Sequence, residues 1–125
     1  MEFHGLEAYQ KAFAMAMEIF KITKDFPKEE KYSLTDQIRR SSRSVCANIA
    51  EAYRTRNYPT HFVRKLTDSD GENSETLVWL NFALACEYIS KSKFQELVDE
   101  NKSIGKLINY MILNPKKFGC NGEAN

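Results

Sequence analysis

One stretch, residues 33–56 (SLTDQIRRSSRSVCANIAEAYRTR), decides the fold. Its apolar side chains recur at the spacing of an amphipathic helix: Leu34, Ile38, Val45, Ile49, Ala52 and Tyr53. Ser33 is a favourable N-cap, and Asp36 in the first turn suits the helix dipole. At 100° per residue, an arc of about 100° on the other side holds four arginines: Arg39, Arg40, Arg43 and Arg54. The stretch therefore predicts a helix with one apolar face and one cationic face.

Three further segments show helical periodicity. Residues 5–24 carry a stripe predicted to face the core: Leu6, Tyr9, Phe13, Ala16, Met17 and Phe20. Residues 60–89 carry another, in which Asp70 and Asn73 interrupt the apolar side chains: Phe62, Leu66, Leu77, Leu80, Leu84 and Tyr88. Ser92 and Gln95 predict a capping box that opens a last helix ending before Asn114-Pro115. Together these segments predict an all-α, antiparallel up-down-up-down four-helix bundle over residues 1–118, followed by a flexible C-terminal tail, 119–125.

The composition excludes several classes of protein. A chain of 125 residues with 42% hydrophobic side chains can bury a core, so global disorder is excluded. No apolar run reaches the ~18 residues of a membrane span, and the first residues lack the pattern of a signal peptide, so we expect a cytoplasmic protein. Neither a metal motif nor a nucleotide-binding or nucleophile motif occurs, which predicts no cofactor and no enzymatic activity.

The three cysteines are far apart, which argues against a disulfide framework. Cys46 and Cys86 lie in helical, partly apolar contexts and are predicted to behave as small buried side chains. Cys120 belongs to the predicted tail and is expected to be exposed.

Charge is distributed unevenly along the chain. Seven cations and one carboxylate between residues 37 and 65 give +6, so the rest of the chain carries −5 against a total of +1. One interpretation is a phosphate-binding surface, with these candidate nucleic-acid-binding residues: Arg43, Arg54, Arg56, Arg64 and Lys65. The other is structural pairing of arginines with Glu51 and with the acidic run 68–75. A structural polar network would then comprise Arg39, Arg40, Asn48, Glu51, Asp70, Asn73 and Glu75.

Aromatic residues suggest two further surfaces. Residues 53–58 interleave tyrosines with arginines, a mixture that either stacks on nucleic-acid bases or packs at the bundle end. Trp79, Phe82 and Cys86 lie on the face of their helix opposite its first stripe, so we predict that they form an oligomer interface.

Several motifs occur in an order that resembles a known family. They include Phe26-Pro27, residues 37–42 (QIRRSS), residues 47–51 (ANIAE), and residues 114–118 (NPKKF). Over residues 5–118 the chain resembles the four-helix bundle family of proteins encoded in intervening sequences of bacterial 23S ribosomal RNA genes, once labelled "S23 ribosomal protein". Ala52 departs from the usual glycine of the family, a change that suits a helix.

The resemblance implies a ring-like homopentamer. In a related branch, the accessory variability protein of diversity-generating retroelements, a basic pentamer binds reverse transcriptase and nucleic acid. We therefore expect a non-enzymatic, homo-oligomeric binding or scaffold protein that contacts RNA or a nucleic-acid enzyme. The alternative is a purely structural protein–protein interaction module without a nucleic-acid role.

Overall fold

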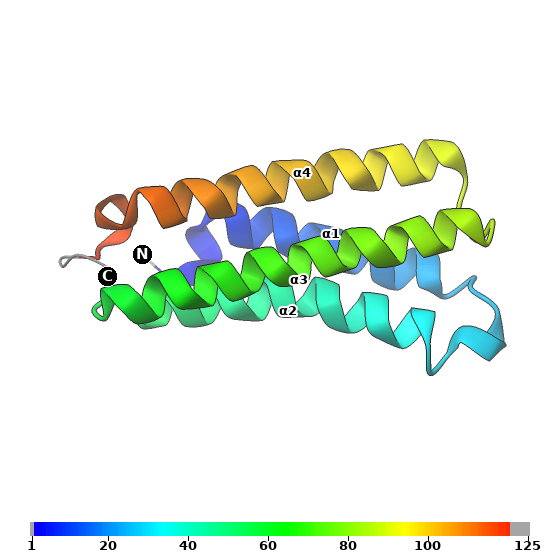
Figure 1. The fold of residues 1–125 in the computed structure, drawn as a ribbon, viewed down its shortest axis with the longest axis horizontal. Helices are drawn as coiled ribbons and strands as arrows, with labels where there is room; N and C mark the ends of the chain where they lie inside the picture. The colour runs from blue at the N-terminus through cyan, green and yellow to red at the C-terminus, as the bar shows by residue number, and fades with distance from the viewer. Residues whose placement is uncertain (1, 121–125) are drawn as a thin grey trace.

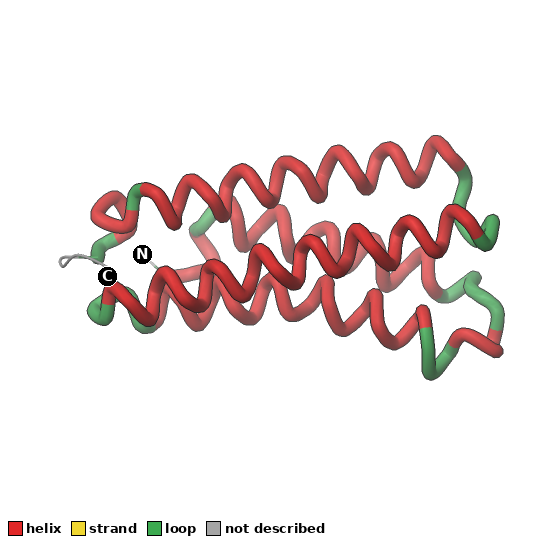
Figure 2. The backbone as a smooth tube through the Cα atoms, viewed as in Figure 1, coloured by secondary structure: helices red, strands yellow, loops and turns green. Residues whose placement is uncertain are grey.

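The computed structural model describes residues 2–120. Its four α-helices are α1 (Glu7–Thr23), α2 (Leu34–Arg54), α3 (Pro59–Ala85) and α4 (Lys91–Leu113). Three short 3₁₀ helices flank them: η1 (Phe3–Gly5), η2 (Lys28–Glu30) and η3 (Pro115–Phe118). Consecutive helices run in opposite directions (Figure 1), and short connectors join them at the two ends of the bundle (Figure 2). The predicted all-α, up-down-up-down bundle is confirmed, and no strand occurs among the described residues.

The four helices surround a main apolar core, and a smaller cluster of Phe26, Leu34 and Ala83 lies near the α1–α2 connector. Each helix packs against its neighbours in sequence, and α1 also packs against α4, so that α1 and α3 lie diagonally opposite each other. The predicted stripe of α2 is confirmed, because all its members are buried: Leu34, Ile38, Val45, Ile49, Ala52 and Tyr53. Within residues 2–120, no helix is both long enough and apolar enough to cross a membrane.

The stripe predicted for α1 is confirmed only in part: Leu6 and Ala16 are buried, and Tyr9 and Phe20 are partly buried. Phe13 and Met17 are 50% and 42% exposed, whereas the buried face consists mainly of Ala8, Ala12, Met15 and Ile19. The observed face is rotated by about 100° from the predicted one, since α1 is apolar on two sides. The alanines pack inward because their small side chains let neighbouring helices approach closely. The larger side chains consequently form an exposed apolar surface.

The connection from α3 to α4 also differs from the prediction. α3 ends at Ala85 rather than near residue 89, and Glu87 has a left-handed φ of 62°. The N-cap of α4 is Ser90, whose Oγ accepts a hydrogen bond from the Lys93 amide at 3.0 Å, so the predicted Ser92 capping box is wrong. Gly71, by contrast, lies within an unbroken helix.

Buried polar side chains pair between helices. Asn73 of α3 and Asn101 of α4 exchange hydrogen bonds: each side-chain amide donates to the other's backbone oxygen, at 2.9 and 2.8 Å. Between α2 and α3, the hydroxyls of Ser41 and Thr76 lie 2.8 Å apart, and Ser69 donates to the Val45 carbonyl at 2.8 Å. These contacts satisfy polar groups that would otherwise be costly to bury.

The single polar network predicted from the sequence does not form. Asp70 is exposed, and Asn48 donates to the Ser44 carbonyl of its own helix at 3.0 Å. Asn73 finds its partner on α4 rather than on α2. The prediction failed because Asn101 was not recognised as a buried residue: its neighbours in sequence are charged or polar, and it looks like part of a solvated face.

A glycine ends η3 and turns the chain toward the core. Gly119 adopts φ 91° after η3, and Cys120 is fully buried against the core, which raises the pKa of its thiol. Cys120 was predicted to be exposed and Cys86 to be buried, and both predictions are wrong, since Cys86 is exposed. Cys46 is buried as predicted, and burial raises its pKa to about 11. The rest of the predicted tail, 121–125, lies outside the described residues.

Candidate nucleic-acid interface

The cationic face of α2 borders an open hollow of about 590 Å³. Four cationic side chains line it, Lys31, Arg39, Arg40 and Arg43, with the single carboxylate of Asp36. Three of them lie within two turns of α2, because positions 39, 40 and 43 are helical neighbours on its outer side. The hollow is therefore a concave surface with a net charge of +3.

Arg39 is held in place by neutral groups rather than by a carboxylate. Its Nε donates to Thr23 Oγ1 at 2.7 Å, and its guanidinium lies 4.8 Å from the ring centroid of Phe20. The Thr23 hydroxyl in turn donates to the Ile19 carbonyl at 2.7 Å. Arg39 thus keeps its full positive charge while it joins α2 to the end of α1. Arg40 and Arg43 beside it are exposed.

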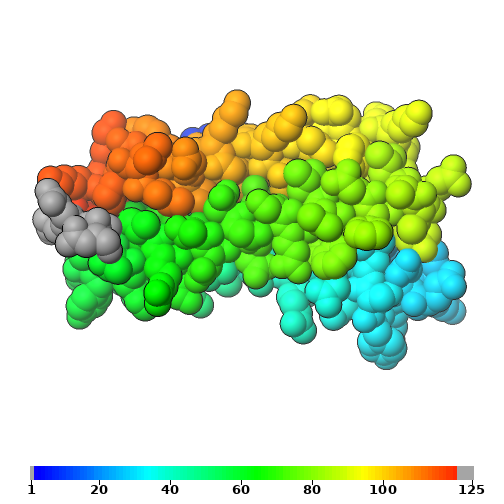
Figure 3. All heavy atoms as spheres, in the orientation of Figure 1, coloured from blue at the N-terminus to red at the C-terminus, as the bar shows by residue number. Residues whose placement is uncertain are grey.

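The connector between α1 and α2 adds an aromatic platform to the hollow. Tyr32 is 85% exposed, and the Lys31 ammonium lies 5.4 Å from its ring centroid. Figure 3 shows this cyan region protruding at the lower edge of the molecule. Lys31 and Tyr32 were not predicted to be site residues. The only feature in the sequence that points to them is a basic residue next to an aromatic one shortly after Pro27.

A carboxylate anchors this connector. Glu30 accepts hydrogen bonds from Ser33 Oγ at 2.6 Å and from Tyr88 Oη at 2.8 Å, and these two contacts lower its pKa. The hydrogen bond from Tyr88 to Glu30 also raises the pKa of Tyr88 to about 12. Tyr88 belongs to the α3–α4 connection, so the two connectors at this end of the bundle are tied together directly next to Lys31 and Tyr32.

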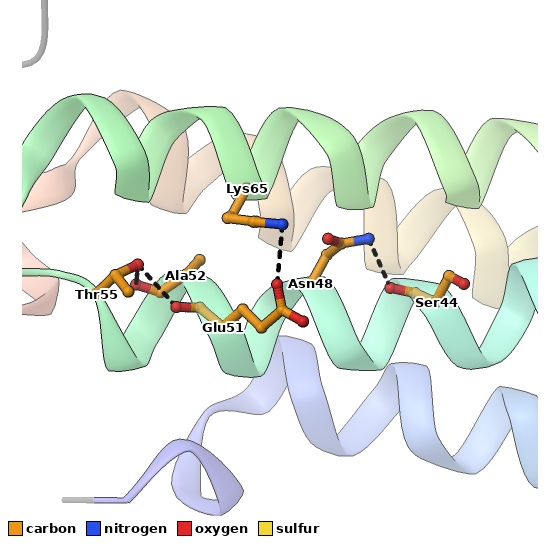
Figure 4. Close-up of polar contacts among 6 residues, drawn as sticks. All are labelled: Ser44, Asn48, Glu51, Ala52, Thr55 and Lys65. Carbon is orange, nitrogen blue, oxygen red and sulfur yellow. Dashed lines mark hydrogen bonds and ion pairs between the residues drawn. The ribbon is translucent and has the colours of Figure 1, made fainter.

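The arginines do not pair with the acidic run of α3. Within residues 2–120, no arginine has a carboxylate oxygen within 4.0 Å. Glu51 of α2 pairs instead with Lys65 of α3 at 2.9 Å (Figure 4). Burial and the neighbouring Glu75 and Asp68 raise the pKa of Glu72, and Arg40 only partly opposes them. The alternative in which Arg39 and Arg40 pair with carboxylates is therefore not supported among residues 2–120, although Arg39 is packed against α1.

The predicted binding residues at the α2–α3 turn differ in their exposure and in the contacts they already make. Arg54 and Arg64 are exposed, and the Arg54 guanidinium lies 5.7 Å from the ring centroid of Phe3. Arg56 is partly buried: it donates to the Tyr53 carbonyl at 2.8 Å and stacks on the Tyr53 ring at 4.1 Å. Tyr53 itself is buried, which favours the packing interpretation for this tyrosine over base stacking. Lys65 is engaged by Glu51.

The residues predicted to form an oligomer interface lie on the outer side of α3. Phe82 is 53% exposed and Cys86 is exposed, while Trp79 is partly buried. The Trp79 ring lies at a 38° tilt to the Phe82 ring, with 5.9 Å between the ring centroids. The Trp79 indole N–H is buried and has no hydrogen-bond acceptor among the described residues. The assignment of these residues to an interface stays a prediction.

Fold and surface together define a class: an all-α bundle with a cationic, aromatic-edged hollow. In the part of the chain that the structure describes, no group of three histidine, cysteine or carboxylate side chains could hold a metal ion.

The comparisons with known proteins identify the family. A family model described as "23S rRNA-intervening sequence protein" matches residues 4–110, and the chain belongs to this family. Among solved structures, it is similar to a protein of unknown function from the S23 ribosomal protein family of Bacteroides thetaiotaomicron. The two chains are 29% identical and superpose with a TM-score of 0.77, over 85% of this chain and 95% of the other. No curated protein matches.

Proposed function

We propose that the protein is a non-enzymatic, homo-oligomeric scaffold that binds single-stranded RNA through the hollow beside α2. The observation that carries this proposal is the set of arginines lining one concave surface with no carboxylate within 4.0 Å of any of them among residues 2–120. Guanidinium groups without such partners are suited to bidentate binding of phosphate.

Tyr32 favours a single strand over a duplex. An exposed aromatic ring beside cations can stack on an unpaired base while the arginines bind the backbone. The family's association with ribosomal RNA genes makes RNA the first nucleic acid to test. The ring-like pentamer implied by the family resemblance would repeat the hollow five times and strengthen binding through multivalency.

The test is binding of fluorescent single-stranded RNA at a series of salt concentrations. Replacing Arg40 by glutamine should weaken binding and lower the salt slope by about 0.7, which is the contribution of one phosphate contact on a single strand. The matched control replaces Lys102 by glutamine, which removes the same charge from an exposed site on α4. Equal losses in both variants would mean that binding follows net charge alone, and would refute this site.

A second candidate function is a purely structural interaction module without a nucleic-acid role. The exposed apolar side chains Phe13, Met17 and Phe82 favour it, because surfaces of this kind serve protein contacts. No RNA binding at about 50 mM salt by an intact oligomer would select this candidate over the first.

A further inference from the structure

An apolar groove of about 390 Å³ lies between α1 and α2. Phe13 and Met17 of α1 form one wall, and the small side chains of Ala47 and Ala50 lie on the α2 side. Phe13 and Met17 are about half exposed, although they are large and apolar. We refer to these four residues and Arg43 as the α1–α2 groove.

The α1–α2 groove carries positive charge without a carboxylate partner among residues 2–120. Arg43 lines the groove, and Arg54 lies over the ring of Phe3, another lining residue. Neither guanidinium has a carboxylate oxygen within 4.0 Å in residues 2–120. The groove is thus complementary to an apolar helix face that also carries carboxylates.

Such a face occurs on α3 of the same chain. Val78 and Phe82 are 48% and 53% exposed, and they follow Glu75 at the helical spacings i+3 and i+7. Glu75 lies one turn before Val78 and has no cation within 4.0 Å among the described residues. We refer to Glu75, Val78 and Phe82 as the α3 strip.

We infer that the α3 strip of one copy docks into the α1–α2 groove of a second copy. Val78 and Phe82 then cover Phe13 and Met17, while the carboxylate of Glu75 faces Arg43. This inference rests on the homo-oligomer of the proposed function and names the two surfaces that form it.

The arrangement of the helices makes this contact head-to-tail. The two surfaces differ, and α1 lies diagonally opposite α3, so one copy can use its α3 strip and its α1–α2 groove at the same time. Contacts between different surfaces build closed rings or open filaments, whereas a twofold dimer would join identical surfaces.

Two single substitutions test the pairing by light scattering. Phe13→Asp disables the groove and Phe82→Asp disables the strip, and each variant alone should be a monomer of 14.5 kDa. An equimolar mixture should form a dimer of twice that mass, because the intact strip of one variant meets the intact groove of the other. Leu113→Asp is the matched control: Leu113 is 70% exposed at the end of α4, and its replacement should leave the assembly unchanged. Circular dichroism monitors folding of every variant.

Charge exchange provides a second test if an aspartate variant fails to fold. Arg43→Glu and Glu75→Arg should each reduce the oligomer mass, and the chain carrying both changes should regain it. Failure of the double variant to regain mass would overturn the proposed pairing.

The outcomes separate this inference from the proposed function. A wild-type chain that is itself a monomer at micromolar concentration overturns the homo-oligomer and the inference together, while RNA binding is measured independently. A wild-type oligomer that survives Phe13→Asp or Phe82→Asp overturns the inference alone. So does a mixture of the two monomeric variants that stays monomeric, which would point to contact between identical surfaces or to docking of a different protein.

Discussion

The polar groups between α2, α3 and α4 and the charged groups on the outer faces of α2 and α3 follow opposite patterns. Inside, Asn73 and Asn101 satisfy each other, and Ser41 and Thr76 do the same. Outside, the arginines of α2 lie near the carboxylates of α3 without a short ion pair between them in residues 2–120. Buried polar groups must find partners within the chain, whereas solvated charges need none and stay available to other molecules.

The largest effect is expected inside, for Asn101→Leu. The change removes the Asn101 Nδ2 donor from the side-chain oxygen and the backbone oxygen of Asn73, although Asn73 Nδ2 keeps its bond to the Asn101 backbone oxygen. The buried Asn73 Oδ1 is then left without a donor, which should lower the free energy of unfolding by about 2–3 kcal/mol. Urea denaturation measures the loss. The double variant Asn73→Leu with Asn101→Leu should recover part of it, since both polar side chains are then removed. If the single variant has a free energy of unfolding within about 0.5 kcal/mol of wild type, the buried Asn73 does not depend on its partner, contrary to the comparison above.

Arg39→Gln should cost less, about 1 kcal/mol, because it removes the hydrogen bond to Thr23 and the contact with Phe20. Arg39 lies between the two regions, being half-buried and in contact with α1. The measurement is again urea denaturation. If the variant is as stable as wild type, Arg39 belongs with the exterior charges.

Glu87→Gly should stabilise the chain by about 0.5–1 kcal/mol. Glu87 is exposed, so no lost contact opposes the relief of its left-handed φ of 62°. Glycine adopts this conformation readily, although it gives up some stability through the entropy of the unfolded chain. Thermal unfolding measures the change; Glu87→Ala, which retains a Cβ, should not reproduce the gain.

A smaller, pH-dependent effect is expected for Glu72→Gln. The pKa of Glu72 is raised in the folded chain, so this carboxyl binds its proton more tightly when folded than when unfolded. Its contribution to stability is therefore present below its ordinary pKa and is lost as pH rises through the raised value. The variant should gain stability relative to wild type between about pH 4 and pH 7. A constant difference across this range would show that Glu72 does not titrate as described.

The smallest effect on stability is expected for Arg40→Gln, within about 0.5 kcal/mol of wild type. Arg40 is exposed and has no carboxylate oxygen within 4.0 Å among residues 2–120. Its RNA affinity should nevertheless fall. Urea denaturation and RNA titration of the same sample measure both quantities. A marked loss of stability would place Arg40 among the structural residues.

Much of the fold could be predicted because α2 has one clear apolar stripe, and every member of that stripe is buried. The buried face of α1 could not be predicted in the same way, because α1 has two apolar faces. Hydrophobicity alone favours the face with Phe13 and Met17 over the face with alanines. The location of the candidate site was only partly predictable. Arg40 and Arg43 follow from helical spacing, but Lys31 and Tyr32 reach the same hollow through the path of a connector, which periodicity does not describe.

The reciprocal amide contact between Asn73 and Asn101 has a consequence for the evolution of this family. Loss of either amide removes the hydrogen bond between the two side chains and leaves the other amide buried with a backbone partner only, so intermediate sequences with only one asparagine are disfavoured. Positions 73 and 101 should therefore covary among relatives, as two asparagines or as two apolar residues. That coupling would also fix the axial alignment of α3 against α4, because a shift by one helical turn separates the two amides by about 5 Å.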